Sequence, residues 1–373
     1  MKMTPKKKIA ILTINDYSNY GNRLQNYALQ ETVRAMESEV ETLVYDRNLV
    51  SVPIHSKFKK LFNLKNWGGI KRRILLNLNK RIYQEKILNF KNFTNKYISE
   101  SDFKINDLYV PVKLSEDYDF FITGSDQVWN PFFKFGTEID FLTFAPTHKR
   151  ISYAPSFGVS NLSTQETINY KEKLKGFEKI SVREDAGAVI IKNITGKEVP
   201  VLVDPTLLLK KEEWLKISYP DVDKPMENYL LTYFLGEISE ETQKNIDDIA
   251  NEYRLKVINL GSLKDRVRYS VGPSEFLDYL NSASLIFTDS FHGCVFSIVF
   301  EKPFIVFERY IKNETSMNSR IDTLLSKLNL KERKWSAIVN RKDLFYIEYA
   351  PIKEILDKER EKSYNFLKKT MSL

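Results

Sequence analysis

Short apolar runs alternate with amphipathic stretches along most of the chain. The apolar runs predict strands at residues 8–14, 40–45, 118–123, 150–154, 179–182, 199–204, 229–234, 256–259, 285–288 and 305–307. The amphipathic stretches predict helices at residues 24–36, 164–177, 239–253, 274–282, 290–302, 321–328 and 352–367. Several strands are continuous apolar runs, which are typical of parallel sheets buried on both faces. The pattern therefore predicts an α/β fold.

The chain of 373 residues is longer than one typical domain, and its alternation of strands and helices restarts after residues 199–204. We therefore expect two Rossmann-like domains of similar size facing a central cleft, residues 1–207 and 208–350. Residues 351–373 are expected to form a helix that packs back on the first domain. The chain opens with a βαβ pattern that lacks G-x-G-x-x-G, so a dinucleotide is not indicated.

The stretch from Leu285 to Phe307 predicts a buried strand, a polar turn, a buried helix and a second strand. Ser290 lies where a helix N-cap is expected, followed by His292 and Gly293. Ligands of open α/β sheets bind at the carboxyl ends of strands, and a helix start favours anions. This turn is therefore a candidate ligand site. The alternative is that Ser290 only caps the helix and His292 is an ordinary buried histidine.

Polar residues also follow the predicted strands of the first half. Asn22 and Arg23 precede its first helix, where they are placed to contact an anion or an acceptor; simple capping by Asn22 is an equal alternative. Asp126 and Gln127 follow the strand at residues 118–123. There a carboxylate suits a general base and an amide suits a sugar hydroxyl. A turn-forming role is the alternative for Asp126.

Two arginines stand at the starts of predicted helices. Arg183 stands at a strand end that opens a helix and is suited to a bidentate grip on phosphate or carboxylate. Its alternative is a surface ion pair with Glu184 or Asp185. Arg320 begins a predicted helix after a polar loop at residues 310–319.

The net charge of +8 is unevenly distributed. Residues 57–96 hold twelve Lys or Arg and one acid, Glu85, interleaved with apolar residues. This pattern predicts a basic helical hairpin, about residues 57–98, inserted in the first domain. It fits an anionic membrane surface or a lipid-phosphate acceptor. A solvated hairpin whose apolar residues pack inward is an equal alternative, and no motif indicates nucleic acid.

No apolar run approaches the length of a membrane-spanning helix, and the apolar residues 9–14 near the N-terminus predict a strand rather than a signal peptide. The single cysteine, Cys294, excludes an intramolecular disulfide and offers no thiolate cluster for zinc. We therefore expect a cytoplasmic protein. Peripheral binding at the inner face of the membrane is the added expectation if the basic hairpin meets anionic lipid.

Five stretches of the sequence together resemble the polysaccharide pyruvyl transferase family. They are YGNRLQNYALQ (20–30), DFFITGSDQVWN (119–130), ISVREDAG (180–187), VLVDPTLLL (201–209) and TDSFHGCVFSIVFEKPFIVF (288–307). The resemblance covers roughly residues 8–330. It implies a glycosyltransferase-B-like fold of two Rossmann-like domains. It also implies transfer of pyruvate from phosphoenolpyruvate onto a sugar of a capsular or exopolysaccharide precursor, usually as a cyclic ketal on two hydroxyls.

By position, Arg183 resembles the family arginine that contacts the donor, and His292 resembles the histidine of the family's C-terminal Arg-x-His motif. Ser290 stands where that motif has its arginine. Phosphoenolpyruvate carries a phosphate and a carboxylate, which together need several cationic or N–H donors. We therefore expect Arg320, with the helix N-terminus at Ser290, to supply the missing charge.

The resulting hypothesis assigns His292 as an acid or a phosphate-binding cation, because imidazole exchanges protons near neutral pH. It assigns Asp126 as the base that acts on the acceptor hydroxyl. Its donor-binding residues are Arg183, Ser290, Gly293 and Arg320, and its acceptor-binding residues are Asn22, Arg23 and Gln127. The expected partners are phosphoenolpyruvate as donor and a sugar or lipid-linked oligosaccharide as acceptor, without a metal or other cofactor. A nucleotide-sugar glycosyltransferase of the same fold and a non-catalytic glycan or lipid-phosphate binding module are the alternatives.

Overall fold

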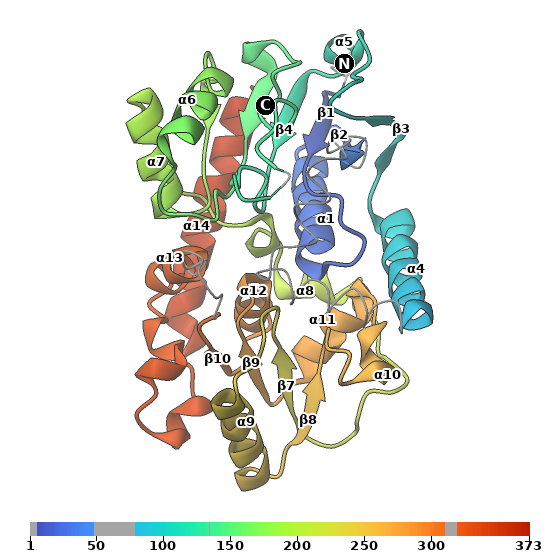
Figure 1. Ribbon diagram of the computed structural model, residues 1–373, viewed down its shortest axis with the longest axis vertical. Coiled ribbons are helices and arrows are strands. Elements are labelled where there is room, and N and C mark those ends of the chain that lie inside the picture. The colour runs from blue at the N-terminus through green and yellow to red at the C-terminus, as the bar shows by residue number, and fades with distance from the viewer. Residues whose placement is uncertain (1–5, 48–78, 134, 310–318) are drawn as a thin grey trace, which may run out of the picture.

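A computed structural model describes residues 6–47, 79–133, 135–309 and 319–373 (Figure 1). Its strands form a six-stranded sheet of order β3-β2-β1-β4-β5-β6 and a four-stranded sheet of order β10-β9-β7-β8. All pairs within these sheets are parallel. The predicted α/β fold with two Rossmann-like domains is confirmed.

The first sheet has the Rossmann strand order, which places β1 and β4 at the point where the order reverses. Its strands are β1 (Lys8–Leu12), β2 (Glu39–Tyr45), β3 (Glu100–Ile105), β4 (Phe120–Thr123), β5 (Arg150–Ser152) and β6 (Lys179–Ile180). The α-helices among the described residues of this half are α1 (Tyr20–Arg34), α4 (Lys80–Tyr97), α5 (Leu114–Asp117), α6 (Thr164–Lys173) and α7 (Asp185–Thr195). The loops after β1 and β4 therefore lie where a ligand of such a sheet binds.

The second sheet lies in the lower half of Figure 1. Its strands are β7 (Tyr229–Tyr233), β8 (Lys256–Asn259), β9 (Leu285–Thr288) and β10 (Phe304–Val306). Its helices include α8 (Lys211–Leu215), α9 (Glu240–Glu252), α10 (Arg266–Tyr269), α11 (Pro273–Ser282), α12 (Phe291–Val299) and α13 (Ser319–Lys327). The domain limits given above stay a prediction.

The structure corrects three expectations about local structure. The edge strand β3, with the sequence ESDFKI, was not expected, because its alternating charges lack an apolar run. Residues 199–204 are not a strand and join the sheet through a single bridge between Val182 and Val201. Helix α1 begins at Tyr20 because the Asn19 side chain caps it by accepting from the Asn22 N–H. Asn22 and Arg23 therefore lie in the first turn of α1, and Asn22 is not the cap.

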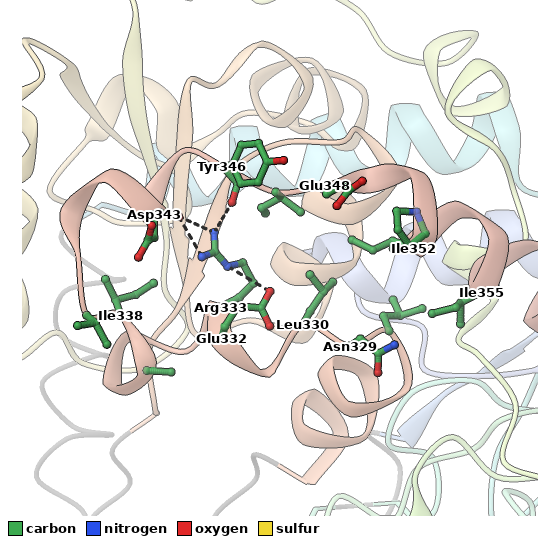
Figure 2. Close-up of a pocket in the computed structure, with 15 residues that line it drawn as sticks. Asn329, Leu330, Glu332, Arg333, Ile338, Asp343, Tyr346, Glu348, Ile352 and Ile355 are labelled. Atoms are coloured by element: carbon green, nitrogen blue, oxygen red, sulfur yellow. Dashed lines mark hydrogen bonds and ion pairs between the residues drawn. The ribbon is translucent and has the colours of Figure 1, made fainter.

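The C-terminal helix α14 (Tyr349–Thr370) runs along both halves (Figure 1). Near its start, Ile352 is buried in an apolar cluster with residues of the second half. Near its end, Leu367 packs among buried residues of the first sheet. Beside its first turns lies a cavity of about 440 Å³, in which Arg333 donates hydrogen bonds to the Asp343 carbonyl (Figure 2). Helix α14 therefore ties the two halves together.

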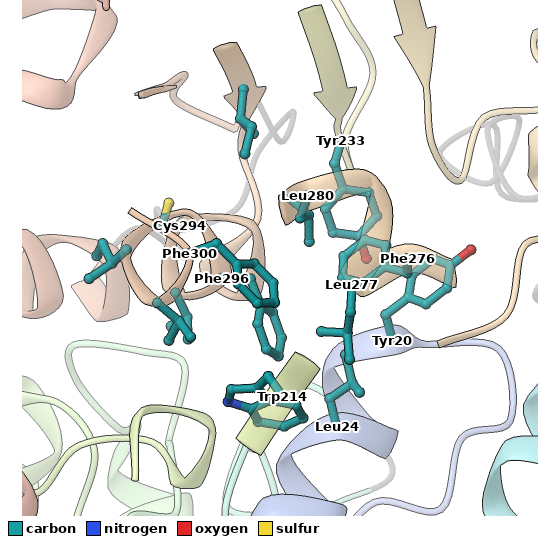
Figure 3. Close-up of a cluster of buried hydrophobic side chains, with 14 of the residues drawn as sticks. Tyr20, Leu24, Trp214, Tyr233, Phe276, Leu277, Leu280, Cys294, Phe296 and Phe300 are labelled. Carbon is teal, nitrogen blue, oxygen red and sulfur yellow. The ribbon is translucent and has the colours of Figure 1, made fainter. Parts of the chain in front are cut away.

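Aromatic side chains fill the contact between the two halves. Tyr20, at the start of α1, stacks on Phe276 of α11 with ring centroids 4.1 Å apart (Figure 3). The Tyr20 hydroxyl donates to the Val271 carbonyl at 2.7 Å. Trp214 lies between Tyr27 and Phe296, at centroid distances of 5.6 and 5.0 Å. These rings hold the first turn of α1 against the second half.

Most of the predicted basic hairpin, residues 57–78, lies outside the described residues. The described part is α4, where Phe90 and Phe93 are buried in the same apolar cluster as Tyr20. In α4, Phe90 and Phe93 therefore pack inward, whereas Leu88 is 56% exposed. The exposed face of this helix carries cations, among them Lys80, Arg81, Lys91 and Lys96. No helix within the described ranges is long and apolar enough to cross a bilayer.

We expect Phe276→Ala to lower the free energy of unfolding by about 3–5 kcal/mol, because it leaves a cavity against Tyr20 between the halves. Tyr20→Phe removes only the hydrogen bond to Val271 and should cost about 1 kcal/mol. Urea denaturation measures both changes. As a control, Phe132→Ala removes an aromatic side chain that is 62% exposed and should change stability by less than about 0.5 kcal/mol. An equal loss in Phe132→Ala and Phe276→Ala would contradict the role of the stack.

Candidate active site

Arg183 is at the centre of a buried polar cluster. It follows β6 and is 3% exposed. Its guanidinium donates to Asp204 Oδ2 at 2.6 Å and to Asp126 Oδ1 at 3.1 Å. It also lies 4.5 Å from the ring centroid of Phe291, the first residue of α12. Arg183 is therefore not part of a surface ion pair; it is fixed by two carboxylates of the first half against the second half.

Asp126 occupies an unusual backbone position directly after β4. Its φ of 59° lies in the left-handed region, which Asp tolerates better than most residues. The Asn22 side-chain amide donates to Asp126 Oδ2. Burial alone would raise the pKa of Asp126, but the nearby charges of Arg183, His292 and Arg320 outweigh burial and lower that pKa. The carboxylate is therefore ionised and weakly basic. We revise its role from general base to an anion that holds Arg183 and Asn22.

Arg320, in the first turn of α13, joins the cluster from the second half. It is 7% exposed, and its closest carboxylate contact is Asp126 Oδ1, 3.7 Å from its Nη1. With its amide oxygen turned toward Arg320, Gln127 accepts from both terminal nitrogens at 3.3 Å. Burial and the positive charge of Arg183 lower the pKa of Arg320 to about 10. Arg320 is thus charged near neutral pH, yet its charge is less closely compensated than that of Arg183.

His292 lies in the first turn of α12, next to the start of α1. Its Nε2 is buried, without a hydrogen-bond partner among the described residues, and lies 3.7 Å from Asp204 Oδ1. Gly21 of α1 lies directly against the ring, so that a Cβ at this position would clash with His292 Nδ1. The predicted ligand site at β9 and the start of α1 therefore meet at this histidine.

Ser290 and Gly293 shape the start of α12. The Ser290 hydroxyl oxygen accepts from the Gly293 N–H at 3.3 Å, which confirms Ser290 as the N-cap. A Cβ on Gly293 would clash with Thr288 Oγ1. Both residues therefore set the geometry of the helix N-terminus. Asp289, beside them, accepts from the Leu235 N–H at 2.7 Å and from Arg309 Nε at 3.0 Å.

Arg23 lies apart from this cluster. It is fully buried, donating to Glu100 Oε1 at 2.8 Å and to the Ile14 carbonyl at 3.0 Å. The Tyr17 hydroxyl donates to the other oxygen of Glu100 at 2.6 Å. Arg23 therefore fixes the loop after β1, and we do not retain it among the proposed acceptor-binding residues.

Sequence reasoning missed two carboxylates of the cluster. Asp204 was not singled out as a site residue, although Asp-Pro after an apolar run marks the end of a strand-like segment. Glu184 was considered only as a surface partner. Its Oε1 accepts from Ser156 Oγ at 2.9 Å and from the Phe157 N–H at 2.8 Å, whereas its Oε2 has no partner within the described part of the chain. Burial raises the pKa of Glu184 despite the opposing charges of Arg183 and Arg320.

The cavity of Figure 2 does not coincide with this cluster, since no residue of the predicted site lines it. Among the described residues there is no group of three or more His, Cys, Asp or Glu side chains placed to hold a metal ion. The cluster around Arg183 is thus the place where the predicted residues of the two halves converge.

A family model described as polysaccharide pyruvyl transferase matches residues 19–309. The match covers most of the chain, which therefore belongs to this family and is a transferase. A comparison with curated proteins gives no match.

Several solved structures are similar in backbone. A Listeria monocytogenes protein assigned as a UDP-N-acetylglucosamine 2-epimerase has 12% identity and a TM-score of 0.49, covering 98% of this chain and 91% of that chain. The Methanocaldococcus jannaschii UDP-GlcNAc 2-epimerase has 12% identity and a TM-score of 0.43, covering 93% and 98%. Arabidopsis thaliana UGT89C1, complexed with UDP-L-rhamnose, has 11% identity and a TM-score of 0.45, covering 99% of both chains.

We expect Glu184→Gln to make the protein relatively more stable as the pH rises. A carboxyl with a raised pKa in the folded state binds its proton more tightly there than in the unfolded state. It therefore contributes stability at low pH that is lost as the pH rises from about 4.3 through the folded pKa. Gln removes this loss while keeping an acceptor for Ser156 and Phe157. Urea denaturation between pH 4 and pH 8 should show the difference in unfolding free energy, variant minus wild type, increasing with pH.

The matched control is Glu361→Gln, which changes an exposed glutamate on α14. Its difference from the wild type should be constant across the same pH range. A Glu184→Gln difference that is equally flat, or that falls with pH, would contradict a raised pKa.

Proposed function

We propose that this transferase moves pyruvate from phosphoenolpyruvate onto two hydroxyls of a sugar in a capsular or exopolysaccharide precursor. The product is a ketal, and phosphate is released. The observation that carries the proposal is the convergence of Arg183, Arg320 and His292, from both halves, on one buried cluster in a chain of this family.

The arginines suit a donor with two anionic groups. Phosphoenolpyruvate carries a phosphate and a carboxylate, each of which accepts paired hydrogen bonds from a guanidinium. Arg320 is the stronger candidate for a ligand contact, because its nearest carboxylate is 3.7 Å away, whereas Arg183 donates to two carboxylates at 2.6 and 3.1 Å. A buried cation so weakly paired gains stability when an anion binds. This supports Arg320 as the substitute for the arginine that Ser290 replaces.

The proposed reaction begins with protonated His292. It gives a proton to the methylene carbon of phosphoenolpyruvate. This protonation makes the second carbon of phosphoenolpyruvate electrophilic. A sugar hydroxyl attacks that carbon and its proton returns to the imidazole. Phosphate leaves with its bridging oxygen, and the second hydroxyl closes the ketal. The protons of the two hydroxyls end on the new methyl group and on the phosphate.

In this scheme Asp126 acts through its neighbours. It holds Arg183 toward the donor and orients the Asn22 amide, while Gln127 lies against Arg320. The amides of Asn22 and Gln127 are the proposed contacts for acceptor hydroxyls. Ser290 and Gly293 contribute the N-terminus of α12, which favours the donor phosphate.

Donor binding can be measured by calorimetry with phosphoenolpyruvate. We expect binding to the wild type and at least about tenfold weaker binding to Arg183→Ala, Arg320→Ala and His292→Ala, because a hydrogen bond to a charged group contributes about 1.5–3 kcal/mol. The control is Arg341→Ala, whose arginine is half exposed and pairs with Glu252. It should bind phosphoenolpyruvate as the wild type does.

A panel of nucleotide-sugars in the same experiment tests the alternative glycosyltransferase. Binding of a nucleotide-sugar without binding of phosphoenolpyruvate would overturn the proposed donor and favour the alternative. Binding of phosphoenolpyruvate that is insensitive to Arg183, Arg320 and His292 would overturn the proposed site.

We further propose that the acceptor is lipid-linked and that the protein works peripherally at the cytoplasmic face of an anionic membrane. The sequence places eleven net positive charges in residues 57–96. In the described part of this segment, α4 buries Phe90 and Phe93 and exposes four cations and Leu88. The expected attraction is therefore electrostatic rather than insertion of an apolar helix face.

We expect salt-sensitive binding to vesicles that contain anionic lipid and no binding to neutral vesicles. Replacing Lys80, Arg81 and Lys91 with Glu should weaken vesicle binding at least about tenfold, since each basic residue near such a surface contributes about 1 kcal/mol. Vesicle sedimentation at several salt concentrations measures this. The control changes three exposed lysines of α14, Lys358, Lys368 and Lys369, to Glu. Equal losses in both triple variants would argue against a specific role for α4.

A further inference from the structure

Asp204 lies between Arg183 and His292, which come from different halves of the molecule. It is 1% exposed and follows the bridge between Val182 and Val201. Its Oδ2 accepts from Arg183 at 2.6 Å and from Ser125 Oγ at 2.9 Å. Its Oδ1 accepts from Thr206 Oγ1 at 2.6 Å and faces His292 Nε2 at 3.7 Å. The carboxylate is therefore held rigidly by three side chains while one of its oxygens points toward the histidine.

The two nitrogens of His292 have different surroundings. Nε2 is buried and has no hydrogen-bond partner among the described residues. The carboxylate oxygen that an Nε2–H group would face is Asp204 Oδ1, 3.7 Å away. Nδ1 lies on the side of Gly21, where the missing Cβ leaves room for it. The other charged groups that act on this cluster are the carboxylates Asp126 and Glu184 and the arginines Arg183 and Arg320.

Electrostatics distinguishes the two neutral forms of the ring. An Nε2–H directed at a carboxylate oxygen 3.7 Å away is attracted to it, whereas a bare Nε2 lone pair is repelled by the same negative charge. Burial strengthens both effects, because little water screens them. The pKa of Asp204 is lowered: burial, which would raise it, is outweighed by His292, Arg183 and Thr206. Asp204 therefore keeps its negative charge near neutral pH.

We propose that Asp204 is a positioning residue that keeps the proton of neutral His292 on Nε2 and thereby makes Nδ1 the nitrogen that exchanges a proton with the substrate. The role of Nδ1 rests on the pyruvyl transfer proposed above. The protonation of Nε2 does not, because it follows from the protein alone. A carboxylate that fixes the tautomer of a histidine in this way is effective even when the carboxylate never touches the substrate.

The chain is well suited to a direct test, since it has only three histidines, His55, His148 and His292. Long-range ¹H–¹⁵N correlation spectra of ¹⁵N-labelled full-length protein distinguish a protonated ring nitrogen from an unprotonated one. Recorded at alkaline pH, where imidazole is neutral, the signals missing in His292→Gln identify His292. We expect these signals to show a protonated Nε2 and an unprotonated Nδ1. A protonated Nδ1, or an even mixture of the two forms, would overturn the proposal.

The variant Asp204→Ala tests whether the Asp204 carboxylate is what keeps the proton of His292 on Nε2. Without the carboxylate, the predominance of the Nε2–H form should be lost. Asp140→Ala is the matched control, because Asp140 is also a fully buried carboxylate paired with an arginine, Arg47. It should leave the His292 signals unchanged. Unchanged signals in folded Asp204→Ala would overturn the role of Asp204, and the wild-type spectrum decides the tautomer even if this variant does not fold.

The spectrum is recorded without substrate, so the two proposals fail separately. An Nε2–H form combined with no binding of phosphoenolpyruvate would remove the proposed donor and leave the pairing of Asp204 and His292 intact. An Nδ1–H form combined with donor binding would remove the role of Asp204 and leave pyruvyl transfer intact.

Discussion

The ion pair between Arg183 and Asp204 is the interaction on which the site depends. Both side chains are at most 3% exposed, and their closest atoms are 2.6 Å apart. Removing one partner of such a pair leaves a buried charge and typically costs about 3–5 kcal/mol. The pair therefore fixes the segment that carries Asp204 against the end of β6, although this segment joins the sheet through only one bridge. Asp126 and His292 are placed relative to this pair.

The apolar contact between the halves and the geometry of the site share one helical turn. Tyr20 stacks on Phe276 in the second half, and the next residue, Gly21, contacts the ring of His292. Asn22, one residue further, donates to Asp126. A shift of the aromatic stack would therefore displace the histidine and the Asp126 carboxylate relative to each other. Close packing at the interface is thus also a condition for the arrangement of the polar cluster.

Much of the fold could be predicted from the sequence, because burial leaves a local signal. The continuous apolar run at Leu285–Thr288 is strand β9, and Ser290 caps the following helix as expected. The local sequence pattern did not predict elements and side chains that are held in place by partners distant in sequence. Strand β3 has charged residues at an edge and is recognisable only by its pairing with β2. Arg23 was assigned to a ligand because its partner, Glu100, is 77 residues away.

The same limit applies to the site. Arg183 and His292 could be named from the sequence because they stand in stretches that together resemble a known family, and the structure brings them to one cluster. Asp204 and Glu184 could not be assigned, because their importance lies in which atoms they contact and not in their spacing. The lowered pKa of Asp126 likewise results from side chains distant in sequence, Arg183, His292 and Arg320. A single sequence shows which residues carry charge, whereas the three-dimensional contacts decide how each charge is used.

Ser290, which by resemblance stands where the family motif has an arginine, illustrates this point. A serine at this position is a strong N-cap and accepts from the Gly293 N–H, so it stabilises the start of the helix that presents His292. In the proposed donor site, Arg320 is the counterpart of that guanidinium; it enters the same cluster from α13 and lies near Asp126 and Gln127. An anionic ligand is attracted by a cation at a given position, whichever helix supplies that cation. The site can therefore keep its positive charge while the local motif changes, provided that α13 stays packed against α7, where Thr323 Oγ1 accepts from the Asp185 N–H at 3.3 Å.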